Sequence, residues 1–296
     1  MVVKNTDSSH IKFNDVVDNK TAIELAFIII KDMENYFTLP MKLEFEKIYE
    51  KYIILTKKRY MALVANTDGV IISSTKRGVC IQRRDGCKVL RTIYTEVKDM
   101  LLADKTKDEI ISVVLDGINK IFTFGYSYKD YVVTKGLTKD IDGYNTKTLP
   151  AQAQIAQRMM KRGIDVAVGS RIEYIFTTKC KYDKHINQGE KAEDIDYFRN
   201  NRDYLRIDYL YYLEKQLINP LDELIYVGLG IENFVKHQFE LRRDKDDCMQ
   251  KIKAISLLDV PITSGNLIAL ITHRSWPKFF LGCPRGYVCR CYIGLF

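Results

Sequence analysis

The first part of the chain combines strand-like alternation with one long helical repeat. Ile11 and Phe13 share one face of an alternating stretch, which predicts a strand after a polar turn. Asp18 can cap a helix that runs to about residue 37. That helix is apolar nearly all round, so we expect it to lie buried beneath a sheet. Further strands are predicted at residues 41–46, 51–66 and 69–75.

Beyond about residue 80 the apolar positions recur at helical spacing. One helix is marked by Val89 to Val97, and a second begins at the capping box formed by Thr106 and Glu109. Two further strands are expected, at residues 131–137 and 171–176. Between them we expect a polar loop at 138–150 and a helix at 151–162 that ends at Gly163. A helical section should follow at 204–255, with breaks at Pro220 and at 228–230. The pattern therefore predicts the α+β class.

The tail from residue 260 onward differs in composition from the rest. It has no Asp or Glu, and it holds three of the six prolines and three of the seven cysteines. Cys283, Cys289 and Cys291 do not have the spacing of a structural zinc site, although His273 could supply a fourth ligand. We expect a loosely organised tail.

The composition is that of a globular protein outside the secretory pathway. Of the 296 residues, 46% are hydrophobic and 28% are charged, and no apolar run is long enough to cross a membrane. The amino terminus does not read as a secretory signal. An odd number of scattered cysteines suits a reducing compartment. We expect no membrane association, and a location in the cytoplasm (a viral replication site) or in the nucleus.

Positive charge is concentrated in one segment. The net charge is +8, and residues 57–91 contain nine basic residues against two acids, Asp68 and Asp85. A concentrated basic segment favours a polyanion such as nucleic acid, and a solvated basic face is the equal alternative on charge alone.

The polar stretch KNTDSS near the amino terminus has two interpretations. Asn, Thr, Asp and Ser favour tight turns, because their side chains bond the nearby backbone. Alternatively, the carboxylate of Asp7 marks the tip of a metal-binding hairpin. The residues of this stretch do not decide between the two.

Five stretches carry motifs in a fixed order. They read VVKNTDSSHIKF at 2–13, TKKRY at 56–60, KRGVCIQRRDGC at 76–87, KGLTKDIDGYNTKTLPAQAQIAQRMMKRG with VGSRIEYIF at 135–176, and DYLYYLEKQLINPLDELI at 208–225. In this order they resemble family B DNA polymerases, whose elements usually read YGDTDS, KKRY and KG-x-E-x-V-R-R-D, followed by thumb motifs. The resemblance is closest in character to enzymes of large cytoplasmic DNA viruses, and it covers about residues 2–255.

The resemblance implies a domain organisation. Residues 1–80 would form the carboxy-terminal part of the palm, an antiparallel sheet with a packed helix. Residues 81–259 would form a mainly helical thumb, and 260–296 a tail of uncertain structure. The exonuclease domain, the first palm carboxylate and the fingers helix with its nucleotide-binding lysine would lie upstream, so we expect a carboxy-terminal fragment. A separately encoded amino-terminal part or a processivity factor would then be a partner.

The resemblance also implies a chemistry. In the complete enzyme, two Mg²⁺ ions would support template-directed transfer of nucleotides from dNTPs. Asp7 would be a catalytic metal ligand, whereas Asn5 stands where the family has its principal aspartate. Asn offers a neutral oxygen, so we expect a weak metal site and an isolated chain that is inactive.

The elements that would bind the primer–template duplex are more complete. Basic side chains neutralise phosphates and give affinity without reading sequence. The residues implied in this role are Lys57, Lys58, Arg59, Tyr60, Arg83, Arg84, Lys135, Lys139, Lys147, Arg158, Lys161, Arg162 and Arg171. Tyr60 could instead be a half-buried strand tyrosine, and Asp85 is expected to form a structural ion pair with a neighbouring arginine. Pro150, Ala151 and Gln152 replace the family's usual Pro-His-Val, so a contact of that histidine is lost.

Three functions remain compatible with these residues. The first is part of a replicative DNA polymerase. The second is a catalytically inactive remnant or stand-alone DNA-binding module. The third is a basic structural protein that resembles the polymerase by accident.

Overall fold

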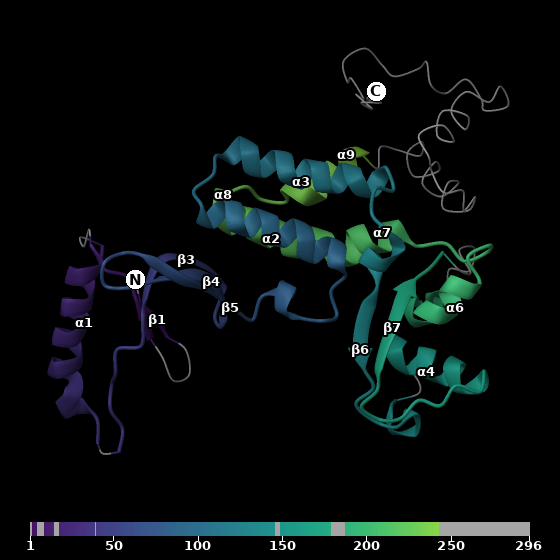
Figure 1. Cartoon of the computed structure of the whole chain (residues 1–296), viewed down its shortest axis with the longest axis horizontal. Helices are drawn as coiled ribbons and strands as arrows, with labels where there is room; N and C mark the ends of the chain where they lie inside the picture. Colours follow the sequence, from purple (N-terminus) through teal and green to yellow (C-terminus); the bar gives the residue numbers. More distant parts are fainter. Residues whose placement is uncertain are drawn as a thin grey trace, which may run out of the picture.

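The structure is a computed structural model of the whole chain (Figure 1). It describes residues 2–4, 9–14, 18–38, 40–145, 149–178 and 187–242. The predictions about Asn5, Asp7, Lys147 and the tail lie outside these residues. The last part of the helical section predicted to reach residue 255 also lies outside them.

A short hairpin and a helix open the chain. Strands β1 (Val2–Lys4) and β2 (Ser9–Ile11) pair antiparallel, with Lys4 opposite Ser9. Helix α1 (Asn19–Met33) begins where predicted, because the Asp18 carboxylate accepts a hydrogen bond of 2.8 Å from the backbone N–H of Thr21. It continues into the 3-10 helix η1 (Glu34–Tyr36).

The predicted burial of α1 is wrong. None of its side chains is buried, and Phe27 and Ile28 are each 55% exposed. Phe27 contacts the ring of Phe45, and β3 is the strand that lies beside the helix. Apolar residues surround the helix, so its sequence is compatible with burial on all sides. Among the described residues, however, only one face of the helix is covered.

The first sheet has three antiparallel strands in chain order. They are β3 (Ile48–Thr56), β4 (Arg59–Ala65) and β5 (Ile71–Arg77). The turn between β4 and β5 forms at the TDG of residues 67–69, where Gly69 has a φ of 78°. The strand predicted at residues 41–46 is wrong, because these residues alternate in sequence but take no regular structure. β5 lies at the sheet edge, with Ile71 and Ile72 exposed.

Two long helices follow the 3-10 helix η2 (Cys80–Gln82). Helix α2 (Lys88–Leu102) buries the predicted stripe from Val89 to Val97. Helix α3 (Lys107–Phe122) begins at the predicted capping box, in which Thr106 and Glu109 bond each other's backbone N–H groups. The two helices pack on each other, and α8 (Ile218–Leu229) and α9 (Phe234–Arg242) complete a helical layer (Figure 1).

A second antiparallel sheet lies at the other end of this layer (Figure 1). Its strands are β6 (Val133–Gly136), β7 (Arg171–Phe176) and β8 (Ala192–Asp194). The helical segments near this sheet are η3 (Tyr128–Tyr131), η4 (Ile141–Gly143), α4 (Ala151–Lys161), α5 (Gln188–Lys191) and α6 (Ile195–Asn200). The strands predicted at 131–137 and 171–176 correspond to β6 and β7, and the described residues beyond residue 80 are otherwise mainly helical, as predicted.

The last helical section is continuous through Pro220, so the break predicted there is wrong. It runs from α7 (Tyr209–Tyr211) through the π-helix η6 (Tyr212–Leu217) into α8 (Ile218–Leu229). Pro220 lies in the first turn of α8, directly after the wider π-helical turns, where its missing N–H costs little. The second predicted break is confirmed, because Gly230 ends α8 with a φ of 70°; helix α9 (Phe234–Arg242) follows.

One hydrophobic core joins these parts. It extends from Met61 of β4 and Val79 through α2 and α3 to the second sheet and α8. Tyr212 lies fully buried in it, and its hydroxyl accepts a hydrogen bond of 3.0 Å from the backbone N–H of Phe176. The β3–β5 sheet and the β6–β8 sheet therefore share a core through the helical layer.

Two buried tyrosines give a matched test of this core. Tyr212→Phe leaves the Phe176 N–H without its acceptor, so the free energy of unfolding should fall by about 1–3 kcal/mol. The hydroxyl of Tyr131 is also buried, and it has no hydrogen-bond partner among the described residues. Tyr131→Phe should therefore cost less than about 0.5 kcal/mol, or stabilise the protein. Urea unfolding measures both; equal losses would contradict this assignment.

Candidate nucleic-acid interface

The two lysines of TKKRY form the tight turn between β3 and β4. Thr56 pairs with Arg59 across the turn, and both Lys57 and Lys58 are exposed. Lys58 has a φ of 65°, an uncommon left-handed conformation for a residue other than glycine. The turn therefore presents two adjacent positive charges to solvent on a defined backbone.

Gly78 packs directly against this turn. A Cβ at Gly78 would lie 2.5 Å from the carbonyl oxygen of Lys58, and the φ of Gly78 is 62°. The position therefore requires glycine both for its conformation and for the close backbone approach. The KKRY and KRG stretches, which are distant in sequence, are thus in contact.

Two more basic residues lie beside the turn. In the register of β4 and β5, Tyr60 is opposite Arg77 and Met61 is opposite Lys76. The side chain of Gln82 donates a hydrogen bond of 2.7 Å to the carbonyl oxygen of Lys76. Lys76 and Arg77 belong to the basic segment of the sequence but were absent from the predicted site. Their contact with KKRY depends on strand register, which the charge pattern alone does not give.

Tyr60 lies in an aromatic cluster beneath the β1–β2 hairpin. It is 9% exposed, with its ring 5.2 Å from that of Tyr52 and 5.0 Å from that of His10. Nδ1 of His10 lies 2.6 Å from the hydroxyl of Tyr52. Burial lowers the pKa of His10 and raises the pKa of Tyr52 to about 12, which keeps both rings neutral near pH 7. This packing supports the alternative of a strand tyrosine.

Arg59 is engaged with a helix. Its two terminal nitrogens donate hydrogen bonds of 2.7 Å to the two carboxylate oxygens of Glu223 on α8. A second ion pair, between Lys51 of β3 and Asp104, also joins the first sheet to the helical layer. Arg59 thus has a carboxylate partner, whereas neither lysine of the turn has one among the residues that the structure describes.

The RRD element lies between η2 and α2. Arg83 donates hydrogen bonds of 3.1 and 2.8 Å to the carboxylate of Asp85, which is the arginine–aspartate pair expected from the sequence. Arg84 is exposed, and its backbone carbonyl accepts a long hydrogen bond of 3.4 Å from the N–H of Thr134. This element therefore connects the first sheet to the start of the second.

Arg158 and Arg162 of α4 face buried carboxylates on β8. Nε of Arg158 lies 3.4 Å from Glu193, which is 1% exposed, and Arg162 pairs with Asp194. The guanidinium of Arg162 also lies 4.1 Å from the ring centre of Tyr197. These contacts hold α4 on the second sheet. Contact of either arginine with DNA stays a prediction.

Lys135 and Arg171 lie on opposite faces of the second sheet. Lys135 pairs with the buried Ile172, whereas Arg171 pairs with Gly136 one position along. Side chains of successive strand residues point to opposite faces. The two residues are therefore separated by the sheet, although the sequence placed them in one group. Lys139 and Lys161 are exposed.

The loop that contains Lys139 is shaped by the side chain of Tyr144. The hydroxyl of Tyr144 accepts hydrogen bonds from the backbone N–H groups of Thr138 (3.0 Å) and Lys139 (3.3 Å). Hydrogen bonding to Thr138 lowers the pKa of Tyr144. The loop around Lys139 thus has a defined local geometry.

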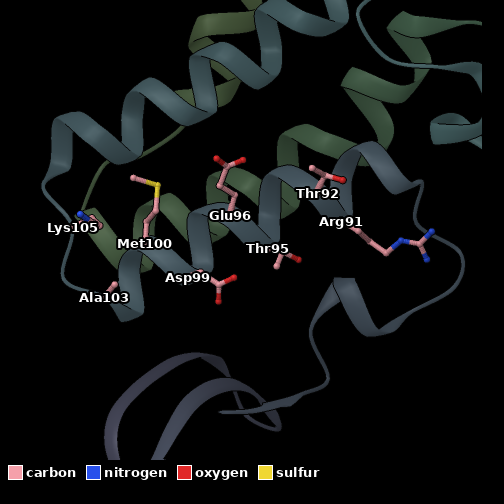
Figure 2. Close-up of a pocket in the computed structure, with 8 residues that line it drawn as sticks. All are labelled: Arg91, Thr92, Thr95, Glu96, Asp99, Met100, Ala103 and Lys105. Carbon is pink, nitrogen blue, oxygen red and sulfur yellow. The ribbon is translucent and has the colours of Figure 1, made fainter. Parts of the chain in front are cut away.

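The part of the chain that the structure describes contains no group of three His, Cys, Asp or Glu side chains that could hold a metal ion. An open hollow of about 720 Å³ runs along α2. Figure 2 shows its residues spread along the helix from Arg91 to Ala103, with Lys105 beyond, and their polar groups do not converge on one point. Among the described residues, no helix is both long and apolar enough to cross a lipid bilayer.

Comparison with known proteins identifies the family. The model of DNA polymerase family B matches residues 2–227. This chain therefore belongs to DNA polymerase family B, which confirms the resemblance seen in the sequence. It is 31% identical to DNA polymerase 120R of Invertebrate iridescent virus 3, over 83% of this chain and 26% of that protein.

Relatives also come from cellular organisms. The chain is 32% identical to the DNA polymerase delta catalytic subunit of Arabidopsis thaliana, over 75% of this chain and 20% of that protein. A solved family B DNA polymerase from Pyrobaculum calidifontis aligns over 70% of this chain and 24% of its own, with a TM-score of 0.48 and 18% identity. The chain spans about a quarter of the length of the first relatives it matches.

Two glycines with similar backbone conformations test the packing of the two-lysine turn. Gly163→Ala introduces backbone strain alone, since its φ is 81° and no atom lies within 4 Å of a new Cβ. Gly78→Ala adds a collision with the Lys58 carbonyl, so it should lower the free energy of unfolding by about 1–3 kcal/mol more than Gly163→Ala does. Urea unfolding of both variants measures the difference, and equal losses would rule out the close approach.

Proposed function

We propose that this chain binds the primer–template duplex as part of a family B DNA polymerase. The observation that carries the proposal is the turn at Lys57 and Lys58, which is exposed, conformationally defined and formed by the family's KKRY element. Two adjacent ammonium groups suit phosphates of the duplex backbone, because they bind charge without reading bases.

The proposed binding surface extends beyond the turn. Lys76 and Arg77 lie on the neighbouring strand, and the exposed Arg84 follows η2. Arg83 is left out of this surface because it pairs with Asp85. We assign residues 1–80 to the palm and 81–259 to the thumb, by the order of the family elements. The shared core, with Met61 and Val79 packed together with α2, supports a rigid junction near residue 80.

Arg59, Arg158 and Arg162 have a different role in this proposal. Each pairs with a carboxylate of the protein, so a phosphate contact would require that pair to break. These three arginines therefore stabilise the fold through their ion pairs, while the exposed basic residues contact DNA.

Duplex binding is tested by its salt dependence. Lys57→Ala/Lys58→Ala should weaken binding equally for two unrelated duplex sequences. It should also flatten the slope of log affinity against log salt by about 1.8, since each phosphate contact contributes about 0.9. Fluorescence anisotropy between roughly 50 and 200 mM salt measures both quantities.

The control variant removes two exposed lysines that lie on helices instead of in the turn. Lys107→Ala/Lys236→Ala changes the net charge by the same amount, but these residues lie on α3 and α9. For this control variant, the slope of log affinity against log salt should stay close to that of the unmodified chain. Equal flattening in both double variants would show a diffuse charge effect and would refute a specific role for the turn.

A second candidate is a DNA-binding module without catalysis, and Asn5 favours it. Two-metal nucleotidyl transfer needs carboxylates that hold two divalent ions. The NTDS tip offers the carboxylate of Asp7 and the neutral amide of Asn5, and this donor set does not fit a pair of Mg²⁺ ions. We therefore assign no catalytic step to these residues.

Primer extension tests whether this polypeptide catalyses nucleotidyl transfer by itself. The 296-residue polypeptide should give no extension with Mg²⁺ or Mn²⁺, and Asn5→Asp alone should not produce any, because one restored carboxylate does not complete the site. A gel assay of highly purified protein, with Asp7→Ala as the control for contaminating polymerase, measures this. Extension by the unmodified chain that disappears in Asp7→Ala would establish catalysis instead.

A further inference from the structure

Arg59 follows the two exposed lysines directly, but its side chain turns toward α8. Its guanidinium meets the carboxylate of Glu223 through two parallel hydrogen bonds of 2.7 Å each. The two side chains are 36% and 28% exposed. This fork geometry fixes both the distance and the plane of the two groups, so it resists rotation better than a single hydrogen bond.

The pair lies beside buried residues, which strengthens it. Burial raises the pKa of Cys80 to about 11, and the charges of Arg59 and Glu223 both act on that thiol. The same two charges act on the buried Tyr94 of α2. An ion pair that is partly shielded from water in this way interacts more strongly than one on an open surface.

The lysine turn depends on its neighbours for its position. Gly78, directly after β5, packs against the Lys58 carbonyl, and Thr56 pairs with Arg59 at the base of the turn. The Arg59–Glu223 pair adds a direct connection from the base of the turn to α8. The turn is thereby held between the first sheet and the helical layer.

We infer that Arg59 is a positioning residue: its bidentate pair with Glu223 holds the Lys57–Lys58 turn against α8, and the two lysines make the phosphate contacts. This inference rests on the proposed binding of duplex DNA. It assigns Glu223 a role in DNA affinity, although an acidic residue near DNA would ordinarily repel it.

The two possible roles of Arg59 predict opposite effects of Glu223→Gln. If Arg59 contacted phosphate, removing its carboxylate partner would release it, raise the affinity and steepen the salt slope by about 0.9. If Arg59 positions the turn, the same change lowers the affinity and leaves the slope unchanged, because the two lysine contacts are the ones that release counterions.

The test measures anisotropy with a random-sequence duplex at several salt concentrations. Glu223→Gln should weaken binding by about three- to fivefold, the upper end of what a partly exposed ion pair contributes. Arg59→Lys should do the same, because an ammonium keeps the charge but loses the fork. The charge swap Arg59→Glu/Glu223→Arg should recover most of the affinity. The control Glu232→Gln removes an exposed acid beyond α8 and should not weaken binding.

A second readout needs no DNA. Endoproteinase Lys-C cleaves after lysine, so its rate at Lys57 and Lys58 reports how firmly the turn is held. The rate should rise in Glu223→Gln and return toward that of the unmodified chain in the charge swap. If the unmodified chain does not bind duplex DNA, the proposed function fails, and this measurement still decides whether the pair holds the turn.

The inference is overturned by either of two results. One is a higher affinity with a steeper slope in Glu223→Gln, which would make Arg59 a phosphate ligand. The other is an unchanged Lys-C cleavage rate in Glu223→Gln, which would show that the pair does not hold the turn.

Discussion

The burial of one face of α2 is the constraint on which the arrangement of both sheets depends. This face carries Val89, Ile93 and Val97, and α2 packs on α3, α8 and the first sheet. The chain enters α2 from β5 through η2 and reaches β6 after α3 and η3. Any displacement of α2 would therefore move the lysine turn relative to the second sheet. The distance between the lysine turn and the basic residues of the second sheet is thus set by apolar packing.

The charged residues divide according to the partners that the fold gives them. Arg59 and Arg162 face carboxylates that the chain supplies from α8 and β8, whereas Lys57 and Lys58 point to solvent. A basic residue in a family motif can thus act in two ways. It can carry charge to a ligand, or it can fix the backbone that carries the charge. The sequence motif is the same in both cases, so it does not distinguish the two roles.

Local signals in the sequence were enough to predict many elements. The cap at Asp18, the capping box at Thr106 and the stop at Gly230 satisfy hydrogen bonds or backbone conformations within a few residues, so they can be predicted without the fold. The family motifs drew attention to Lys57 and Lys58, but the strand predicted over residues 51–66 is interrupted by the turn that these two lysines form. The exposure of α1 and the missing strand at residues 41–46 depend on which distant segments are available to cover or pair with them.

The site was less predictable because its contacts join distant segments. Glu223 lies 164 residues from Arg59, and nothing in the sequence near Glu223 marks it as a partner. Lys135 and Arg171 were grouped by charge, but strand register puts them on opposite faces. The alternation within one strand can be read from the sequence. The register between two strands, which decides whether their side chains share a face of the sheet, cannot.

The exposed edge of β5 has a consequence for how the protein behaves in solution. Its first half presents Ile71 and Ile72, with the exposed Val70 directly before it, and among the described residues only β4 pairs with it. Its second half carries Lys76 and Arg77, and like charges there oppose the approach of a second β5 edge. A polyanion that neutralises this end removes the repulsion. Under the proposed function, binding of a duplex at this end would therefore favour edge-to-edge association of two copies through β5.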